Sequence, residues 1–169
     1  MHPVWLFRSG RRAMSTDRAA RDRCYLRDAI DLAARCPPSR SAFSVGALIV
    51  DVAGTVLATG YSRETDPRDH AEEAALAKLP ATHPALREAT LYSSLEPCST
   101  RASRPRSCTE LILATPIPRI VFAWREPNLF ADCQGAELLH AAGREVVELP
   151  ELAELVRWTN RHLLERPRS

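Results

Sequence analysis

The chain has 169 residues, which is enough for one domain with a sizeable core and too few for two domains of ordinary size. Hydrophobic residues make up 45% and charged residues 26%, close to globular averages, so the composition excludes a disordered or collagen-like chain. The formal net charge of +2 is too small to indicate nucleic acid or an anionic membrane as a partner. We therefore expect a small globular protein that acts on neither.

The five cysteines are the first chemical feature, and their odd number excludes complete internal disulfide pairing. The apolar run Val4–Phe7 is too short for a secretory signal or a membrane span. We therefore expect a reducing, cytoplasmic compartment, where cysteines pack, bind metal or act as nucleophiles. Residues 1–14 are expected to form a disordered arm, with Met14 as an alternative start, and residues 15–169 a single domain.

The first predicted elements are a helix and a hairpin. Ser15 or Thr16 can cap a helix that runs to about Arg35, because apolar residues recur there at spacings of three and four. The prolines that follow Cys36 end it. Two strand-like runs come next, joined by a short turn that contains glycine: Val45–Asp51 and Thr55–Tyr61.

Helices and strands then alternate along the rest of the chain. The expected order is helix His70–Leu79, strand Thr90–Leu95, helix Cys108–Ala114, strand Arg119–Trp124, helix Gln134–Ala142, strand Glu145–Glu148 and a helix from about Glu151 to Leu164. A hairpin followed by such alternation predicts a sheet that is antiparallel at one side and parallel at the other. The fold class is thus α/β: a three-layer α/β/α sandwich with a central mixed sheet of about five strands.

Three separated residues suit a zinc ion. His70 stands at a predicted helix start, Cys98 follows a predicted strand, and Cys108 begins the next helix. One imidazole and two thiolates match the tetrahedral N and S ligation of Zn²⁺. Three protein ligands leave one position for water, as hydrolysis requires. A fourth ligand, from Cys133 or His140, would instead make the site structural.

Glu72 lies two residues after His70, so it cannot readily bind the same ion in the same direction. A carboxylate beside the open position can take a proton from the attacking water and pass it to a ring nitrogen and then to a leaving amine. We therefore expect Glu72 to be the catalytic proton carrier. The spacing resembles the H-x-E…P-C-x-x-C pattern of the zinc-dependent nucleobase deaminases, except that nine residues separate the two cysteines here.

The flanking residues narrow this resemblance. Four segments resemble the deaminase domain of the bifunctional riboflavin-biosynthesis deaminase–reductase. They are Glu96-Pro97-Cys98-Ser99, the long insert after it, Glu126-Pro127-Asn128 and the stretch Gly135–Val146. The resemblance spans about residues 42–148 and implies the cytidine-deaminase-like fold, Zn²⁺ as cofactor and a homo-oligomer, a dimer. Because the chain stops at Ser169, we expect no reductase domain.

The chain departs from that family around the expected substrate pocket. Ala42 and Phe43 replace its usual Asn-Pro, and Ser41–Ala47 instead resembles the Ser-x-Phe-x-Val-Gly-Ala segment of free-nucleoside cytidine deaminases. Those enzymes bind ribose through an Asn-x-Glu, of which Glu64 alone matches. The resemblance also implies that the backbone at Ala71 and the carbonyl of Glu96 orient the ring.

The insert between the two cysteines is rich in arginine. Arg101, Arg104 and Arg106 either form a solvated loop or hold a phosphate, which guanidinium groups bind by paired hydrogen bonds. We place Arg101 and Arg104, with Phe43, among the substrate-binding residues. Packing roles are expected for the remaining cysteines and the tryptophans, and a solvated position for Glu73: Cys24, Cys36, Cys133, Trp5, Trp124 and Trp158.

The sequence thus predicts zinc-dependent hydrolytic deamination, with release of ammonia, of a small aminated heterocycle. A riboflavin-pathway-like aminopyrimidine nucleotide is the first choice. A cytidine or deoxycytidylate type of substrate, or a secondary-metabolite pyrimidine, is the alternative. Two other classes stay open: editing of a nucleic-acid base, against which the weak charge and the missing aromatic–basic stripe count, and a catalytically inactive binding protein, against which the complete His, Glu and Cys set counts.

Overall fold

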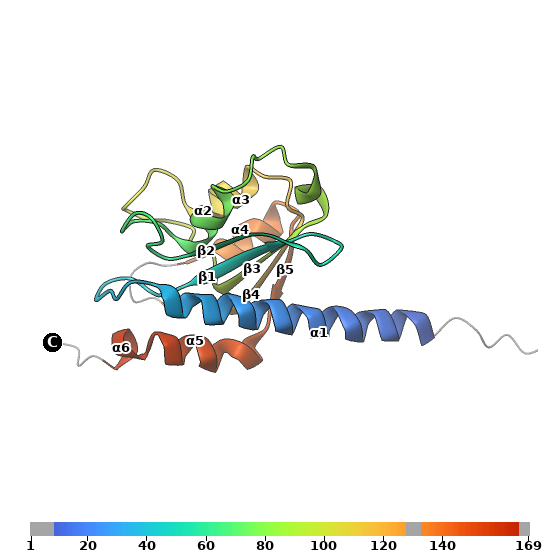
Figure 1. The fold of residues 1–169 in the computed structure, drawn as a ribbon, viewed down its shortest axis with the longest axis horizontal. Helices are drawn as coiled ribbons and strands as arrows, with labels where there is room; N and C mark the ends of the chain where they lie inside the picture. The colour runs from blue at the N-terminus through green and yellow to red at the C-terminus, as the bar shows by residue number, and fades with distance from the viewer. Residues whose placement is uncertain (1–8, 128–132, 166–169) are drawn as a thin grey trace, which may run out of the picture.

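The computed structural model describes residues 9–127 and 133–165, which build one five-stranded sheet (Figure 1). Its strands lie in the order β2-β1-β3-β4-β5. Their bounds are β1 Gly46–Val50, β2 Val56–Tyr61, β3 Thr90–Leu95, β4 Arg119–Trp124 and β5 Glu145–Glu148. β1 runs antiparallel to both of its neighbours, whereas β3, β4 and β5 run parallel. The predicted mixed sheet is confirmed.

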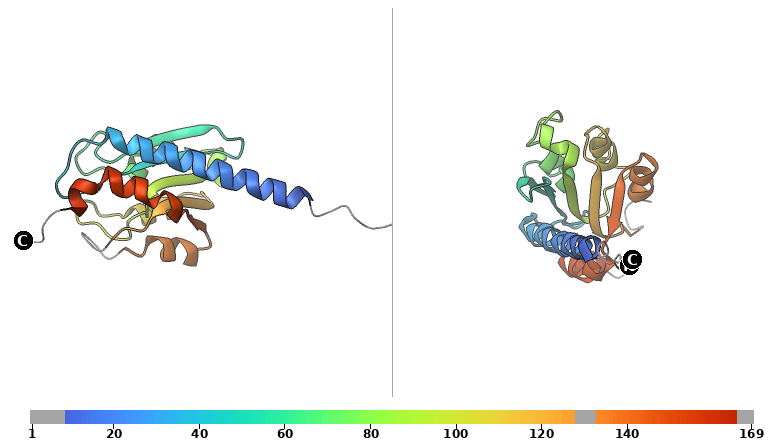
Figure 2. Two further views of the ribbon diagram at one scale, coloured as in Figure 1. Left: turned by 90° about the horizontal axis from the view of Figure 1, so that it is seen from below. Right: turned by 90° about the vertical axis from the view of Figure 1, so that its right-hand side faces the viewer.

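Helices cover both faces of this sheet, as the three-layer prediction requires (Figures 1 and 2). α1 Ser9–Leu32, α5 Ala153–Thr159 and α6 Arg161–Leu164 lie on one side, and α2 Ala71–Leu76, α3 Cys108–Leu113 and α4 Gly135–Ala141 on the other. Short 3-10 turns complete the elements: Ala33–Arg35, Pro84–Glu88 and Pro150–Leu152. Coverage from both sides explains why nearly every residue of β3 and β4 is buried.

The predicted start of the first helix is wrong. α1 begins at Ser9, so Ser15 and Thr16 lie within the helix and not at its start. The segment before them contains no proline and several residues of high helix propensity, so the helix continues through two possible capping residues. Residues 1–8, which include Trp5, lie outside the described residues, whereas residues 9–14 are helical.

The last predicted helix is divided. The expected helix from Glu151 to Leu164 is a 3-10 turn followed by α5 and α6, which meet at Asn160. The Asn160 side chain is fully buried and bonds to the backbone of Ser44, near the start of β1. The contact joins residues 116 positions apart and coincides with the interruption between α5 and α6. The apolar periodicity of the sequence carries no information about such a contact.

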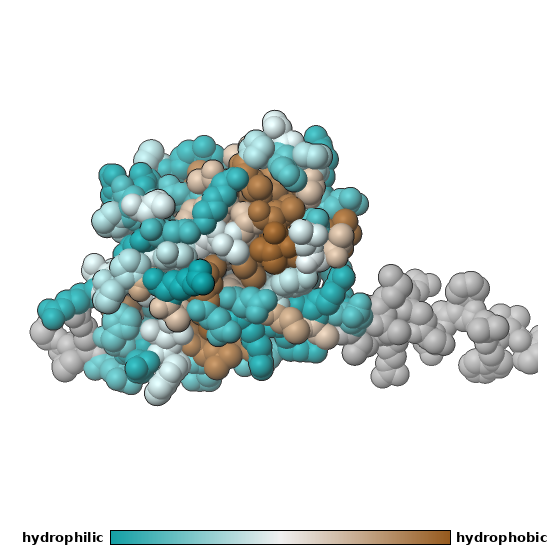
Figure 3. Space-filling view, viewed as in Figure 1, coloured by the Kyte–Doolittle hydropathy of each residue, from teal (hydrophilic) through white to brown (hydrophobic). Residues whose placement is uncertain are grey.

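The described helices include none that is both long and apolar enough to cross a membrane. The face seen in Figure 3 is mostly polar, with apolar side chains gathered in its middle, between α1 and the helices of the opposite layer. β2, the edge strand with exposed Val56, lies at that place.

A buried ion pair fastens α1 to the sheet. Asp22 of α1 accepts hydrogen bonds of 2.8 and 2.7 Å from Arg119 of β4, and one of 2.8 Å from the hydroxyl of Tyr92 on β3. Both charged side chains are less than a tenth exposed. The paired contacts satisfy the carboxylate on both oxygens. Arg119 also pairs with the half-exposed Glu145 at 3.1 Å, so removal of Asp22 leaves the buried guanidinium with one acidic partner instead of two.

We predict that Asp22→Ala lowers the free energy of unfolding by about 3 kcal/mol, the lower end of the range for a broken buried pair, because Arg119 keeps only Glu145 and the Tyr92 hydroxyl loses its acceptor. Glu154→Ala breaks the exposed Glu154–Arg157 pair and serves as the control, with a loss of at most about 1 kcal/mol. Urea denaturation of the two variants measures both values. Equal losses would contradict a special role for the buried pair.

Candidate active site

Three helix and strand ends bring the proposed ligands together. His70 immediately precedes α2, Cys98 follows β3 by three residues, and Cys108 is the first residue of α3. Their ligand atoms all lie within 4.8 Å of one another. His70 Nδ1 is 3.5 Å from Cys98 Sγ and 3.4 Å from Cys108 Sγ. The predicted metal ligands therefore converge.

Two glycines permit the close packing that this convergence needs. A Cβ atom on Gly60 of β2 would lie 2.3 Å from the carbonyl oxygen of Ala71, at the start of α2. A Cβ atom on Gly135, at the start of α4, would lie 1.8 Å from the carbonyl oxygen of Pro97. Any side chain at these positions would push away the segments that carry His70 and Cys98.

The distances between donor atoms fit a tetrahedral zinc ion. Bonds of about 2.0–2.1 Å to nitrogen and 2.3 Å to sulfur, at a tetrahedral angle, would hold those atoms about 3.5 Å apart. Both cysteines are buried, and a soft sulfur pair with one imidazole suits Zn²⁺ better than Mg²⁺ or Ca²⁺. The residues present thus fit the ion.

Hydrogen bonds stabilise a thiolate at this place. The pKa of Cys98 is lowered to about 4, chiefly because the Cys108 thiol donates to it, with His70 contributing. The backbone N–H of Cys108 also donates to Cys98 Sγ over 3.3 Å. The pKa of Cys108 is raised, because its thiol donates to Cys98 and is fully buried. A cation between the two sulfurs would allow both to ionise.

Glu72 is buried next to this cluster. Its side chain lies on α2, 3% exposed, and Oε1 accepts a hydrogen bond of 2.7 Å from the Ser93 hydroxyl on β3. Burial raises the pKa of this carboxyl, and the negative charge of Cys98 raises it further. A carboxyl that is held in place and prefers its proton is suited to pass that proton to a substrate.

A cavity of about 970 Å³ opens over these groups. That volume is at the upper end of the usual range for small-molecule sites. His70, Glu72 and Cys98 form its floor, and the segment before β1, the loop after β2 and the insert after Cys98 contribute its walls. Reactive groups at the bottom of a deep cavity are arranged for chemistry on a small molecule.

Comparisons with known proteins agree with this geometry. Residues 19–124, more than half of the chain, match the family model described as the cytidine and deoxycytidylate deaminase zinc-binding region. The chain belongs to this family.

Within this family, the chain is similar to deaminases of riboflavin biosynthesis. The chain is 43% identical over 126 residues to a diaminohydroxyphosphoribosylamino-pyrimidine deaminase of Schizosaccharomyces pombe, a match that covers 73% of this chain and 31% of that protein. Among solved structures, RibD of Acinetobacter baumannii aligns with a TM-score of 0.75 at 26% identity, covering 86% of this chain and 40% of that one. The Rib2 deaminase of Aspergillus oryzae in complex with DARIPP aligns with a TM-score of 0.63 at 27% identity, covering 75% and 82%.

Four of the six residues predicted to bind substrate line the cavity: Phe43, Ala71, Glu96 and Arg101. Glu64 and Arg104 are not among the lining residues. Glu64 forms an ion pair of 2.7 Å with Lys78, and its side chain is thereby engaged outside the cavity. The Glu96 side chain accepts hydrogen bonds from the backbone of Glu126 and Ala136, so it joins the loop after β4 to the first turn of α4.

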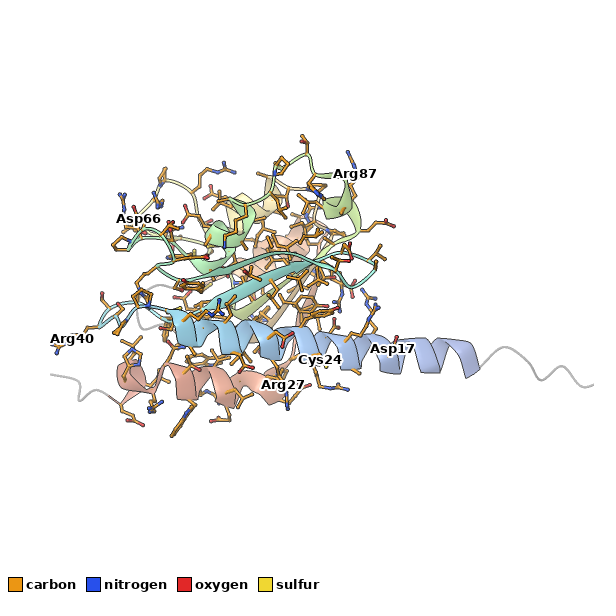
Figure 4. All side chains as sticks on the ribbon, in the orientation of Figure 1. Asp17, Cys24, Arg27, Arg40, Asp66 and Arg87 are labelled. Atoms are coloured by element: carbon orange, nitrogen blue, oxygen red, sulfur yellow. The ribbon has the colours of Figure 1, made fainter. Side chains whose placement is uncertain are left out.

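The arginine insert is tied down by acidic residues. Arg101, only 3% exposed in its side chain, pairs with Glu73 at 3.0 Å. Arg104 pairs with Asp69 at 2.8 Å and with Glu73 at 3.1 Å. The expectation of a solvated Glu73 is therefore wrong: its carboxylate joins α2 to the insert. Asp66, labelled in Figure 4, belongs to the same group and lies 3.7 Å from Arg104.

Glu126 and Arg63 are among the lining residues that were not recognised in the sequence as site residues. Burial, with the charge of Cys98, raises the pKa of Glu126 to about 7. Its position directly beyond the carboxyl end of β4 is the available signal, because ligands bind at that edge of parallel strands. Arg63 has a positive φ of 62°, which no sequence pattern indicated. Asn128, in the matching Glu-Pro-Asn segment, lies outside the described residues.

The remaining cysteines and tryptophans pack less than expected. Cys24, labelled on α1 in Figure 4, is exposed rather than buried, and Cys36 and Cys133 are half-buried. Trp158 is 67% exposed, with Arg161 over its ring, so its predicted packing role is wrong. Both expectations failed because helical spacing alone does not show which turns of a surface helix meet the sheet.

We predict that the purified chain binds about one zinc per molecule and that Cys108→Ser reduces the content to below about a tenth, since loss of a thiolate removes a primary ligand. Cys24→Ser, on the exposed side of α1, is the matched control and should keep its zinc. Elemental analysis after dialysis against a weak chelator measures both. Retention of zinc by Cys108→Ser would refute the assigned ligand set.

Proposed function

We propose that the chain catalyses hydrolytic deamination of an aminopyrimidine nucleotide of the riboflavin-pathway type, with release of ammonia. The observation that carries this proposal is the buried Glu72 beside the His70, Cys98 and Cys108 cluster at the base of one cavity. The printed activity of the S. pombe relative and the ligand of the A. oryzae structure support the substrate class. The chain spans 31% of the S. pombe relative, so the substrate class is a proposal and is not assigned from that relative alone.

Glu72 moves protons in this reaction. His70, Cys98 and Cys108 would hold a Zn²⁺ ion, which would lower the pKa of a water molecule so that it could react as hydroxide near neutral pH. The Glu72 carboxylate takes the proton from that water and gives it to a ring nitrogen, which makes the adjacent carbon electrophilic. After a C–O bond has formed there, Glu72 takes the remaining proton of the new hydroxyl group and delivers it to the amine; the C–N bond then breaks, a C=O bond forms, and ammonia leaves.

The cavity walls would orient the ring. Phe43 presents apolar surface, and the backbone at Ala71 and the carbonyl of Glu96 supply polar groups above the ligands. The ring would thereby be held with its amino-bearing carbon near Glu72. One wall also supports the alternative substrate, a cytidine or deoxycytidylate type, since the segment Ser41–Ala47 resembles that of cytidine deaminases. A panel of substrates distinguishes this type from a riboflavin-pathway aminopyrimidine.

We predict that Glu72→Gln keeps its zinc but lowers kcat by about 10²–10⁴, since an amide cannot carry the proton. The measurement is ammonia release from aminopyrimidines and aminopurines, each free and phosphorylated, with metal analysis of the same preparations. A fully active Glu72→Gln enzyme would exclude the mechanism. Turnover of cytidine compounds alone would exclude the riboflavin-type substrate, and turnover only within nucleic acid would indicate base editing.

Arg101 is proposed to bind the anionic part of the substrate, since it lines the cavity and its bonds to Glu73, Ser103 and the carbonyl of Arg68 use three of its five N–H donors. We predict that Arg101→Lys raises KM for a phosphorylated substrate by about tenfold and changes KM for its unphosphorylated counterpart by less than about twofold. Arg106→Lys, on the exposed part of the same insert and outside the cavity lining, is the control. Equal effects on both substrates would contradict a phosphate contact.

Cellular location and assembly complete the proposal. We infer a cytoplasmic enzyme, because each of its cysteines is free and two of them serve as proposed metal ligands. We also propose a homo-oligomer, a dimer, built on residues 15–169 as one domain, and no nucleic-acid or membrane partner. Light scattering on the purified chain measures its mass, and a monomer at micromolar concentration would contradict the dimer.

A further inference from the structure

One wall of the cavity has no secondary structure of its own. Ser41, Ala42, Phe43 and Val45 line the cavity from the irregular segment that links the 3-10 turn after α1 to β1. A strand or helix is positioned by its regular backbone hydrogen bonds, whereas an irregular segment is positioned by whatever else it contacts. The placement of Phe43 therefore depends on contacts from outside the segment, and two buried or half-buried side chains provide them.

Arg63 holds the segment from the β2 side. Its Nε and Nη2 donate to the carbonyl of Pro37 over 3.0 and 2.8 Å, and its Nη1 donates to the carbonyl of Phe43 over 3.0 Å. Nη2 also donates to the hydroxyl of Ser44 over 3.1 Å. Each of these hydrogen bonds from the guanidinium thus ends on a residue of the segment between the 3-10 turn and β1.

The backbone of Arg63 is itself unusual. Its φ of 62° is in the left-handed region, which a non-glycine residue adopts only where the surroundings hold it. Its N–H donates to the carbonyl of Asp69 over 2.8 Å, which closes the loop between β2 and α2. A glycine would adopt this backbone conformation more easily, so the hydrogen bonds of the arginine side chain are what offset the unfavourable φ angle.

Asn160 holds the segment from the opposite layer. Its Oδ1 accepts a hydrogen bond of 2.7 Å from the N–H of Ser44, and its Nδ2 donates to the carbonyl of the same residue over 3.0 Å. The carboxamide thus pairs with Ser44 as a neighbouring strand would. Asn160 is fully buried and stands where α5 ends, 36 residues beyond the region that matches the family model.

Phe43 meets its own partner between these two clamps. Its ring packs edge-on against Trp124, with the ring centroids 5.8 Å apart, and Arg157 of α5 lies over the same indole. The aromatic pair can form only if the segment has the right position along β4. Arg63 and Asn160 set that position, because they grip the residues on both sides of the Phe43 ring.

We propose that Arg63 and Asn160 are positioning residues that hold Phe43 in the wall of the substrate cavity. The proposal rests on the proposed function for its effect on catalysis, but the ordering of the segment stands apart from it. It makes the C-terminal helices a part of the substrate site: their Asn160 acts on the heterocycle through Ser44 and Phe43, without touching it.

Hydrogen–deuterium exchange tests the clamp without any substrate. The backbone N–H of Val45 donates to the Ser62 hydroxyl, so its exchange rate reports the order of the segment and not the direct loss of either clamp. We expect Asn160→Ala and Arg63→Gly to speed exchange of the Val45 amide, resolved from that of Ser44 by NMR, by about tenfold or more, and to leave the amides of β4 unchanged. Thr159→Ala, beside Asn160, removes a half-buried side chain whose hydroxyl bonds to Leu155 within α5; it is the control and should match the wild type. Unchanged exchange in both clamp variants would overturn the proposal.

Kinetics then test whether the clamps act through Phe43. We expect each variant to raise KM by about tenfold with kcat within about threefold, and Arg63→Lys, which retains the charge without the fork, to lie between the wild type and Arg63→Gly. In a Phe43→Leu background the further rise should fall below about twofold, since coupled residues are not additive. Fully multiplicative effects would overturn the proposal. Absence of wild-type turnover on the whole panel would refute the proposed function, and exchange would still decide the clamp.

Discussion

Two thiolates and an imidazole that must share one ion set the main constraint on this molecule. Their donor atoms come from the ends of three segments that are far apart in the sequence, yet they lie within 4.8 Å of one another. The fold satisfies the constraint by placing α2 and α3 side by side on one face of the sheet, with glycines where a side chain would hold the segments apart. The buried negative charge of the sulfurs then requires a cation, and this requirement links the fold to the metal.

The charges around the cluster are arranged in two zones. Glu72 and Glu126 lie inside the cavity, where burial and the nearby thiolate raise the pKa of both carboxyls. The acidic residues at the rim, Asp69 and Glu73, instead form ion pairs with arginines of the insert. The interior therefore favours groups that exchange protons, and the rim holds a loop in place over them.

Much of this arrangement was predictable from the sequence because it depends on local chemistry. The bounds of β3, β4 and β5 follow from short apolar runs between helical patterns, and the ligand set follows from residue types at helix starts. The start of α1, the exposure of Cys24 and the break at Asn160 depend on contacts between distant segments, and periodicity does not carry that information. The pairing of Glu73 with the arginine insert was missed for the same reason.

The central claim is that the chain holds zinc through one nitrogen and two sulfurs, with one position open for catalysis. X-ray absorption at the zinc edge of the purified chain measures this coordination directly. The account predicts two sulfur neighbours at about 2.3 Å and two nitrogen or oxygen neighbours at about 2.0–2.1 Å, one of which a substrate analogue displaces. A third or fourth sulfur neighbour, or a shell that no analogue changes, would show a closed structural site and contradict the account.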